Sequence, residues 1–334
     1  MSWRRTPAWV YGAFGASFAV AWGLGSEWNS RLVVDPGRFG QPSGAEVSAE
    51  LSAQGSPRVW QKIQKLPSGR SAQYGFVDFK QNRITLSYKV PEAEFKRYND
   101  SYGYRAEDVS ALQKWRDDGI QSSYRLAVEE GKNQAQVDAA AAAIQKQYEA
   151  KLKDYLASHG FMLLPDGVTR VDVPSVVKQN GPLVKPIAQV FERFADKHGY
   201  QSIDIIGAVL SFAQTAIHYK DVADVYKDKH TAGFLLPITT VALGWGDCDT
   251  KTSLVASLLS NWAQMRMVGI AVPGHYLMAV LQLADKGEMF IEYDGLQYVL
   301  LEPAGPGWFP PGHVAEETVA QLNGSDGYQV YPFF

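Results

Sequence analysis

The sequence has very little cysteine: Cys248 is the single thiol among 334 residues. One thiol cannot form a disulfide within the chain and cannot build a cysteine-rich zinc site. The sequence also has no excess of positive charge, because 32 lysines and arginines stand against 35 aspartates and glutamates. No basic stripe with interleaved aromatic residues changes this balance. Disulfide-stapled and zinc-ribbon folds are therefore excluded, and nucleic acid is a poor candidate partner.

Internal repeats and low-complexity tracts are also missing, apart from the alanine run 139–143. Hydrophobic residues make up 46% of the chain and charged residues 20%, a composition typical of globular proteins. The length is about twice that of a common single domain. We therefore expect a folded protein of more than one module.

Residues 6–26 carry no charge, and Arg4 and Arg5 precede them. A helix of this length reaches across the roughly 30 Å of a bilayer core, and basic residues before it favour a cytoplasmic N-terminus. Residues 1–26 are therefore predicted to be a membrane anchor, with a cleaved signal peptide as the alternative. Both place the rest of the chain outside the cytoplasm, in the periplasm or secreted. A buried helix of a soluble domain is the remaining alternative.

Residues 27–70 contain glycine, proline, serine and scattered charge without clear periodicity, so we expect a linker with at most a short helix at 59–66. Residues 84–90 alternate between apolar and polar, as in a half-buried strand, and residues 74–79 are β-prone. These two segments predict a β-hairpin whose apolar face needs a cover.

The helical stretch 106–159 is the expected cover of this hairpin. Apolar residues recur at helical spacing on both sides of Gly131, which predicts an antiparallel helical pair. Hairpin and helical pair form the predicted module 71–165. The polar faces of the pair are either solvated or a surface for a protein partner.

Residues 166–334 combine helix and strand signals and form the predicted catalytic domain. A helix begins at Cys248, and the strands that follow are expected at 267–272, 276–283, 289–293 and 297–301. Asp294-Gly295 joins the last two and is the strongest hairpin signal in the chain. The predicted fold class is α+β, with the cysteine-bearing helix packed on an antiparallel sheet.

Cys248 follows a Gly-Trp-Gly-Asp turn at the start of its helix, where free backbone N–H groups and the helix dipole favour a thiolate. His275 begins a β-prone run and Glu302 ends another, so antiparallel strand pairing can bring their side chains together. This order provides a nucleophile, a general base and a carboxylate that orients the imidazole. Taken singly, each residue has a structural alternative: a packed cysteine, a core histidine and a solvated glutamate.

Five segments carry a combined pattern, namely residues 212–219, 237–240, 246–259, 274–275 and 301–308. Together they resemble the motifs of bacterial and archaeal transglutaminase-like cysteine proteases. The resemblance implies the papain-like thiol fold, with Cys248 as nucleophile, His275 as base and Glu302 as the acidic member. Many relatives have Asp-Pro-Thr where this chain has Glu-Pro-Ala, which keeps the carboxylate and loses the hydroxyl.

Asp247 and Asp249 flank the cysteine, and two nearby anions would weaken it as a nucleophile. The two aspartates weaken the nucleophile little if they cap the helix. If they bind a cation, its positive charge strengthens the nucleophile instead. Some secreted bacterial members of the resembling family hold calcium near the nucleophile. Two carboxylates are few for an ion that takes six to eight oxygens. Calcium is therefore an alternative to a site with no cofactor.

An oxyanion hole would use the backbone N–H of Cys248 and one upstream donor, for which Gln214 and Trp245 are the candidates. Trp308 and Phe309, followed by two prolines, are candidates for the wall of a substrate groove. Core and turn packing is the alternative for both aromatic residues.

The predicted function is an extracytoplasmic cysteine peptidase or amidase that acts on a protein or peptide through a thioester. One alternative is protein cross-linking, in which an amine resolves the same thioester. Another is a non-catalytic binding or scaffold module at the membrane, with residues 106–159 as the partner surface.

Overall fold

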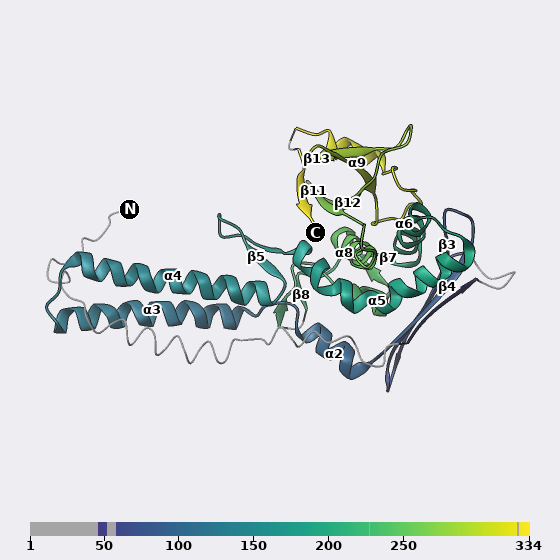
Figure 1. The fold of residues 1–334 in the computed structure, drawn as a ribbon. Helices are drawn as coiled ribbons and strands as arrows, with labels where there is room; N and C mark the ends of the chain where they lie inside the picture. The colour runs from purple at the N-terminus through teal and green to yellow at the C-terminus, as the bar shows by residue number, and fades with distance from the viewer. Residues whose placement is uncertain (1–45, 52–57, 227, 326) are drawn as a thin grey trace. The chain divides into compact units, whose positions relative to one another are not determined.

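The structure is a computed structural model that describes residues 46–51, 58–226, 228–325 and 327–334 (Figure 1). It confirms a mixed α+β protein with helices and antiparallel sheets. The predicted anchor 1–26 and most of the predicted linker lie outside the described residues. None of the helices within the described ranges is long and apolar enough to cross a bilayer.

The described residues form two compact units. The first comprises Gly103–Arg170 with residues 228–230, and the second comprises the described part of 46–102 with Val171–Tyr226 and Thr231–Phe334. The predicted helical pair makes up most of the first unit, whereas the predicted hairpin belongs to the second. This division differs from the expected module 71–165.

The first unit contains the helical pair of α3 (Ala106–Glu129) and α4 (Gln134–Ser158), which lie side by side in Figure 1. A capping box starts α4, because the Asn133 side chain accepts from the Gln136 backbone and the Gln136 side chain accepts in return. Leu112 and Ile144 are buried between the helices. The short strands near this unit are β5 (Phe161–Leu163), β6 (Thr169–Val171) and β9 (Lys229–His230).

The second unit begins with a four-stranded antiparallel sheet in the order β1-β4-β3-β2. Its strands are β1 (Glu46–Leu51), β2 (Trp60–Leu66), β3 (Gly69–Val77) and β4 (Arg83–Pro91). The short helix expected at 59–66 is wrong, because this segment is strand β2. As an edge strand β2 is largely exposed on both faces, so it carries no two-residue apolar alternation in the sequence.

Helices of the same unit pack against this sheet. They are α2 (Glu92–Asp100), α5 (Val173–His198), α6 (Ser202–Ser211), the π-helical turn η3 (Phe212–Ala216) and α7 (Pro237–Leu243). Phe212 is central to this packing: its ring centroid lies 5.2 Å from that of Tyr74, 5.5 Å from that of Phe76 and 6.0 Å from that of Phe191. The cover expected from residues 106–159 is therefore supplied by these elements.

The second sheet of this unit is five-stranded and antiparallel, in the order β13-β14-β12-β11-β15. The strands are β11 (Met267–Val272), β12 (His275–Leu281), β13 (Phe290–Tyr293), β14 (Leu296–Leu301) and β15 (Gln329–Pro332). The four strands expected here are confirmed, and Asp294 and Gly295 take the positive φ angles of 52° and 72° that a tight hairpin requires.

Helix α8 (Cys248–Leu259) packs between β12 and α5 and is almost wholly buried, so it links the strands to the helices (Figure 1). This is the predicted cysteine-bearing helix on an antiparallel sheet. The remaining elements of the unit are α9 (Glu316–Leu322), β8 (Val225–Tyr226) and the parallel pair β7 (His218–Tyr219) and β10 (Trp245–Gly246).

We predict that Phe212→Ala lowers the free energy of unfolding by about 3–5 kcal/mol, because it empties the centre of the aromatic cluster. Chemical denaturation measures the change. Leu283→Ala is the control, since Leu283 is 82% exposed and its replacement should change stability by no more than about 0.5 kcal/mol. Equal effects of the two variants would contradict the packing role.

Candidate active site

The cysteine lies at a tightly built helix start. Asp247 is the N-cap of α8, and its side chain accepts from the backbone N–H of Thr250, so Cys248 becomes the first residue of the helix. A Cβ on Gly246 would lie 2.4 Å from Cγ2 of Thr250, so this position requires glycine. The Cys248 thiol is partly exposed and free.

Strand register brings His275 and Glu302 together. Met278 of β12 pairs with Leu301 of β14 in antiparallel fashion, so the residue after Leu301 lies level with the beginning of β12. The Thr252 hydroxyl on α8 donates to the backbone carbonyl of Tyr276 at 3.2 Å and fastens the cysteine helix to the same end of β12. The two strands and the helix thus converge on one point.

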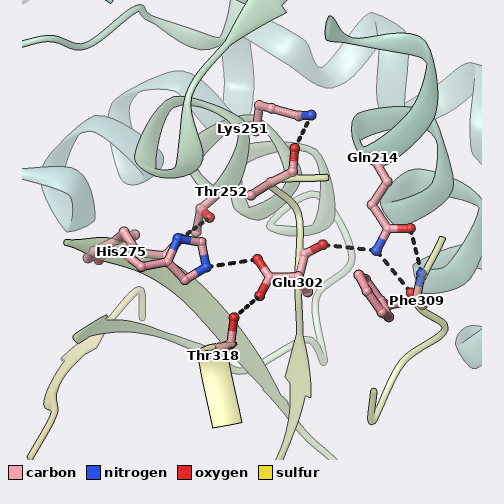
Figure 2. Close-up of polar contacts among 9 residues, drawn as sticks. Gln214, Lys251, Thr252, His275, Glu302, Phe309 and Thr318 are labelled. Carbon is pink, nitrogen blue, oxygen red and sulfur yellow. Dashed lines mark hydrogen bonds and ion pairs between the residues drawn. The ribbon is translucent and has the colours of Figure 1, made fainter. Parts of the chain in front are cut away.

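The three predicted catalytic side chains lie together at this point. The Cys248 side chain lies close enough to the His275 imidazole to raise its pKa. Nε2 of His275 lies 2.9 Å from Oε1 of Glu302 (Figure 2). Because Nε2 is engaged by Glu302, Nδ1 is the ring nitrogen left for the thiol. The Glu302 side chain is only 5% exposed, so its carboxylate is shielded from water.

The imidazole is held in its charged form. Burial lowers the pKa of His275, but the hydrogen bonds with Cys248 and Glu302 and the charges of both groups outweigh burial and raise the pKa to about 10. A cationic ring beside a thiol favours the thiolate.

Thr318, which the sequence analysis did not identify, is a second hydrogen-bond partner of the Glu302 carboxylate. The Thr318 hydroxyl on α9 donates to Oε2 of Glu302 at 2.7 Å, and Thr318 is buried (Figure 2). Thr318 thus provides a hydroxyl donor for this carboxylate from a later segment of the chain. No local signal in the sequence connects the two residues.

Gln214, a predicted oxyanion donor, has another role. Its amide N–H groups donate to the carbonyls of Glu302 and Phe309 at 2.9 Å each, and its Oε1 accepts from the Phe309 N–H at 3.2 Å (Figure 2). Both donors are engaged, so the structure assigns Gln214 to holding the segment after β14. Trp245 stays as the candidate donor; its ring is partly exposed and lies 4.5 Å from the Lys220 ammonium.

The acidic pair beside the thiol takes the capping arrangement. Asp247 and Asp249 both accept from the Thr250 N–H, and the two carboxyl groups contact each other. Burial, together with the hydrogen bond and charge of Asp247, raises the pKa of Asp249 well above its ordinary value. The environment of Asp249 therefore favours its protonated form more than the sequence suggests.

Capping accounts for both carboxylates without a metal. Within the described ranges, no three histidine, cysteine, aspartate or glutamate side chains are grouped closely enough to hold an ion. Calcium at Asp247 and Asp249 stays a prediction.

The predicted groove residues are both built into the fold. The Trp308 ring stacks on Phe79 at a centroid distance of 5.0 Å, and its Nε1 donates to the Ser211 hydroxyl. Trp308 is still 41% exposed, whereas Phe309 is held through its backbone by Gln214. Trp308 thus packs within the fold and Phe309 is fixed through its backbone, and a groove wall at these two residues stays a prediction.

Comparison of the chain with protein-family models, with curated proteins and with solved structures gave no match. The case for a function therefore rests on the residues and their geometry.

We predict that the His275 imidazole is still protonated at about pH 8 and that Cys248→Ala lowers its pKa, because the substitution removes one of the groups that stabilise the cation. Nitrogen NMR of the labelled imidazole follows the titration directly. Titration of wild-type His275 near its ordinary value of 6.5 would contradict the proposed pairing.

We also predict that Thr318→Val costs about 1–3 kcal/mol in the free energy of unfolding, because a buried carboxylate oxygen loses its donor. Thr318→Ser keeps the hydroxyl and is the matched control, with a smaller loss expected. If urea denaturation gives the same loss for both variants, the hydrogen bond to Glu302 is not the cause.

Proposed function

We propose that this chain is an extracytoplasmic cysteine hydrolase of the transglutaminase-like type that cleaves an amide bond in a protein or peptide. The observation that carries the proposal is the hydrogen-bonded pair of His275 and the buried Glu302, which lies beside the Cys248 side chain. The placement outside the cytoplasm rests on residues 1–26 of the sequence, and the family assignment rests on the motifs quoted above.

The proposed reaction begins from the thiolate and the imidazolium. The Cys248 sulfur attacks the amide carbonyl carbon, the carbon–nitrogen bond breaks, and His275 gives its proton to the departing amine. This leaves a thioester on Cys248. Water then attacks the thioester carbon while His275 accepts a proton from it, and the carbon–sulfur bond breaks. This releases the carboxylic acid and restores the thiolate and the imidazolium.

The surroundings support each step. The backbone N–H of Cys248 belongs to the first turn of α8, where N–H groups have no partner within the helix, so it can donate to the developing oxyanion. Glu302 and Thr318 hold the imidazole at a fixed orientation between thiol and carboxylate. These contacts differ from those expected of a solvent-exposed glutamate or of a histidine with a purely structural role in the core.

Labelling with iodoacetamide at neutral pH tests the activated thiol. We expect wild-type Cys248 to react faster than Cys248 in His275→Ala, on the order of tenfold or more, because the variant loses the cation that stabilises the thiolate. Mass spectrometry of the modified peptide measures both rates. Equal, slow rates in the two proteins would overturn the catalytic proposal and favour a binding module.

A product assay separates hydrolysis from cross-linking, since both use the same residues. An unfolded protein substrate is incubated with a fluorescent primary amine and either wild type or Cys248→Ala. The proposal expects new chain ends that depend on Cys248. Covalent incorporation of the amine without cleavage would instead establish transamidation.

A further inference from the structure

Helix α8 carries a buried ionisable side chain, Lys251, that takes no part in the proposed reaction. Lys251 is fully buried, and its Nζ donates to the backbone carbonyls of Ile217, at 3.0 Å, and Ala304 (Figure 2 shows the bond to Ala304). A lysine in such a position is costly, because desolvation disfavours its charge. Lysines are almost never fully buried unless they are paired. The burial of Lys251 and its two hydrogen bonds therefore call for a structural or functional reason.

The two carbonyls belong to segments that build the candidate active site. Ala304 lies two residues after Glu302, and Ile217 leads directly into β7, which pairs with β10 just before Cys248. Lys251 itself lies one turn after Cys248 on α8. The Lys251 amino group therefore links three parts of the candidate site. They are the segment after Glu302, the start of strand β7, and helix α8, which carries Cys248.

The number of hydrogen-bond acceptors around Lys251 favours a neutral amine over a charged ammonium group. A neutral amine has two N–H donors, which match the two carbonyl acceptors found among the described residues. Burial, opposed by the charge of Glu302, lowers the pKa of Lys251 to about 7. A methionine of similar length would fill the space but would leave both carbonyls without a donor.

We propose that Lys251 is a positioning residue, whose hydrogen bonds to Ile217 and Ala304 hold Glu302, and through it His275, in register with the Cys248 thiol. The inference rests on the proposed function, since it concerns the alignment of the same three side chains. Gln214 secures the same segment from the other side by donating to the Glu302 carbonyl. The segment after β14 is thus fixed by donors from both α8 and η3.

The test measures the rate of Cys248 alkylation by iodoacetamide between about pH 5 and pH 9 in wild type and in Lys251→Met. We expect the wild-type rate to persist at about pH 6. The variant should react on the order of tenfold more slowly there and follow the profile of an ordinary thiol, whose pKa is about 8.5. The reason is that a misplaced His275 no longer stabilises the thiolate.

Leu258→Ala is the matched control. Leu258 is also fully buried on α8, but it forms no part of the hydrogen bonds to Ile217 and Ala304. Its truncation destabilises the helix packing and should leave the wild-type pH profile unchanged. Lys251→Leu, which likewise has no N–H donor, replaces Lys251→Met in the comparison if the latter does not fold.

The outcomes separate the two proposals. A wild-type pH profile in the Lys251 variant, or the same shift in Leu258→Ala, would overturn the positioning role while leaving the proposed function standing. Wild type that labels no faster than His275→Ala would remove the proposed function and this inference with it. A shift confined to the Lys251 variant supports the inference.

Discussion

The buried carboxylate of Glu302 is the constraint on which the rest of the site depends. An ionised carboxylate taken out of water must find charged or hydrogen-bonding partners, or it destabilises the fold. Glu302 has His275 on one oxygen and Thr318 on the other. Meeting this requirement fixes the start of β12, the docking of α9 and the orientation of the imidazole at once.

The beginning of α8 poses the opposite electrostatic problem, because it gathers acidic groups around the Cys248 thiol, which the proposed reaction uses as an anion. The raised pKa of Asp249 reduces the negative charge of the pair, and the imidazolium of His275 supplies a positive one. The helix N-terminus favours anions as well. The acidic neighbours of Cys248 are therefore accommodated by capping the helix, by the raised pKa of Asp249 and by the positive charge of His275.

Sequence patterns were sufficient where the structure is local and periodic. The helical pair, four of the five strands of the second sheet and the Asp294-Gly295 turn follow from apolar spacing and turn chemistry, whereas β15 was not predicted. Strand β2 was missed because an edge strand exposed on both faces has no such spacing. Thr318 and the true partners of Gln214 were missed because each is joined to Glu302 across a long stretch of chain, and only folding brings them together.

His275 and Lys251 also bear on how stability depends on pH. The pKa of His275 rises from 6.5 to about 10 on folding, so its contribution is present below pH 6.5 and is lost as pH rises to about 10. The pKa of Lys251 falls from 10.5 to about 7, so the cost of burying it is greatest below pH 7 and disappears toward pH 10.5. The two contributions oppose each other over the same range.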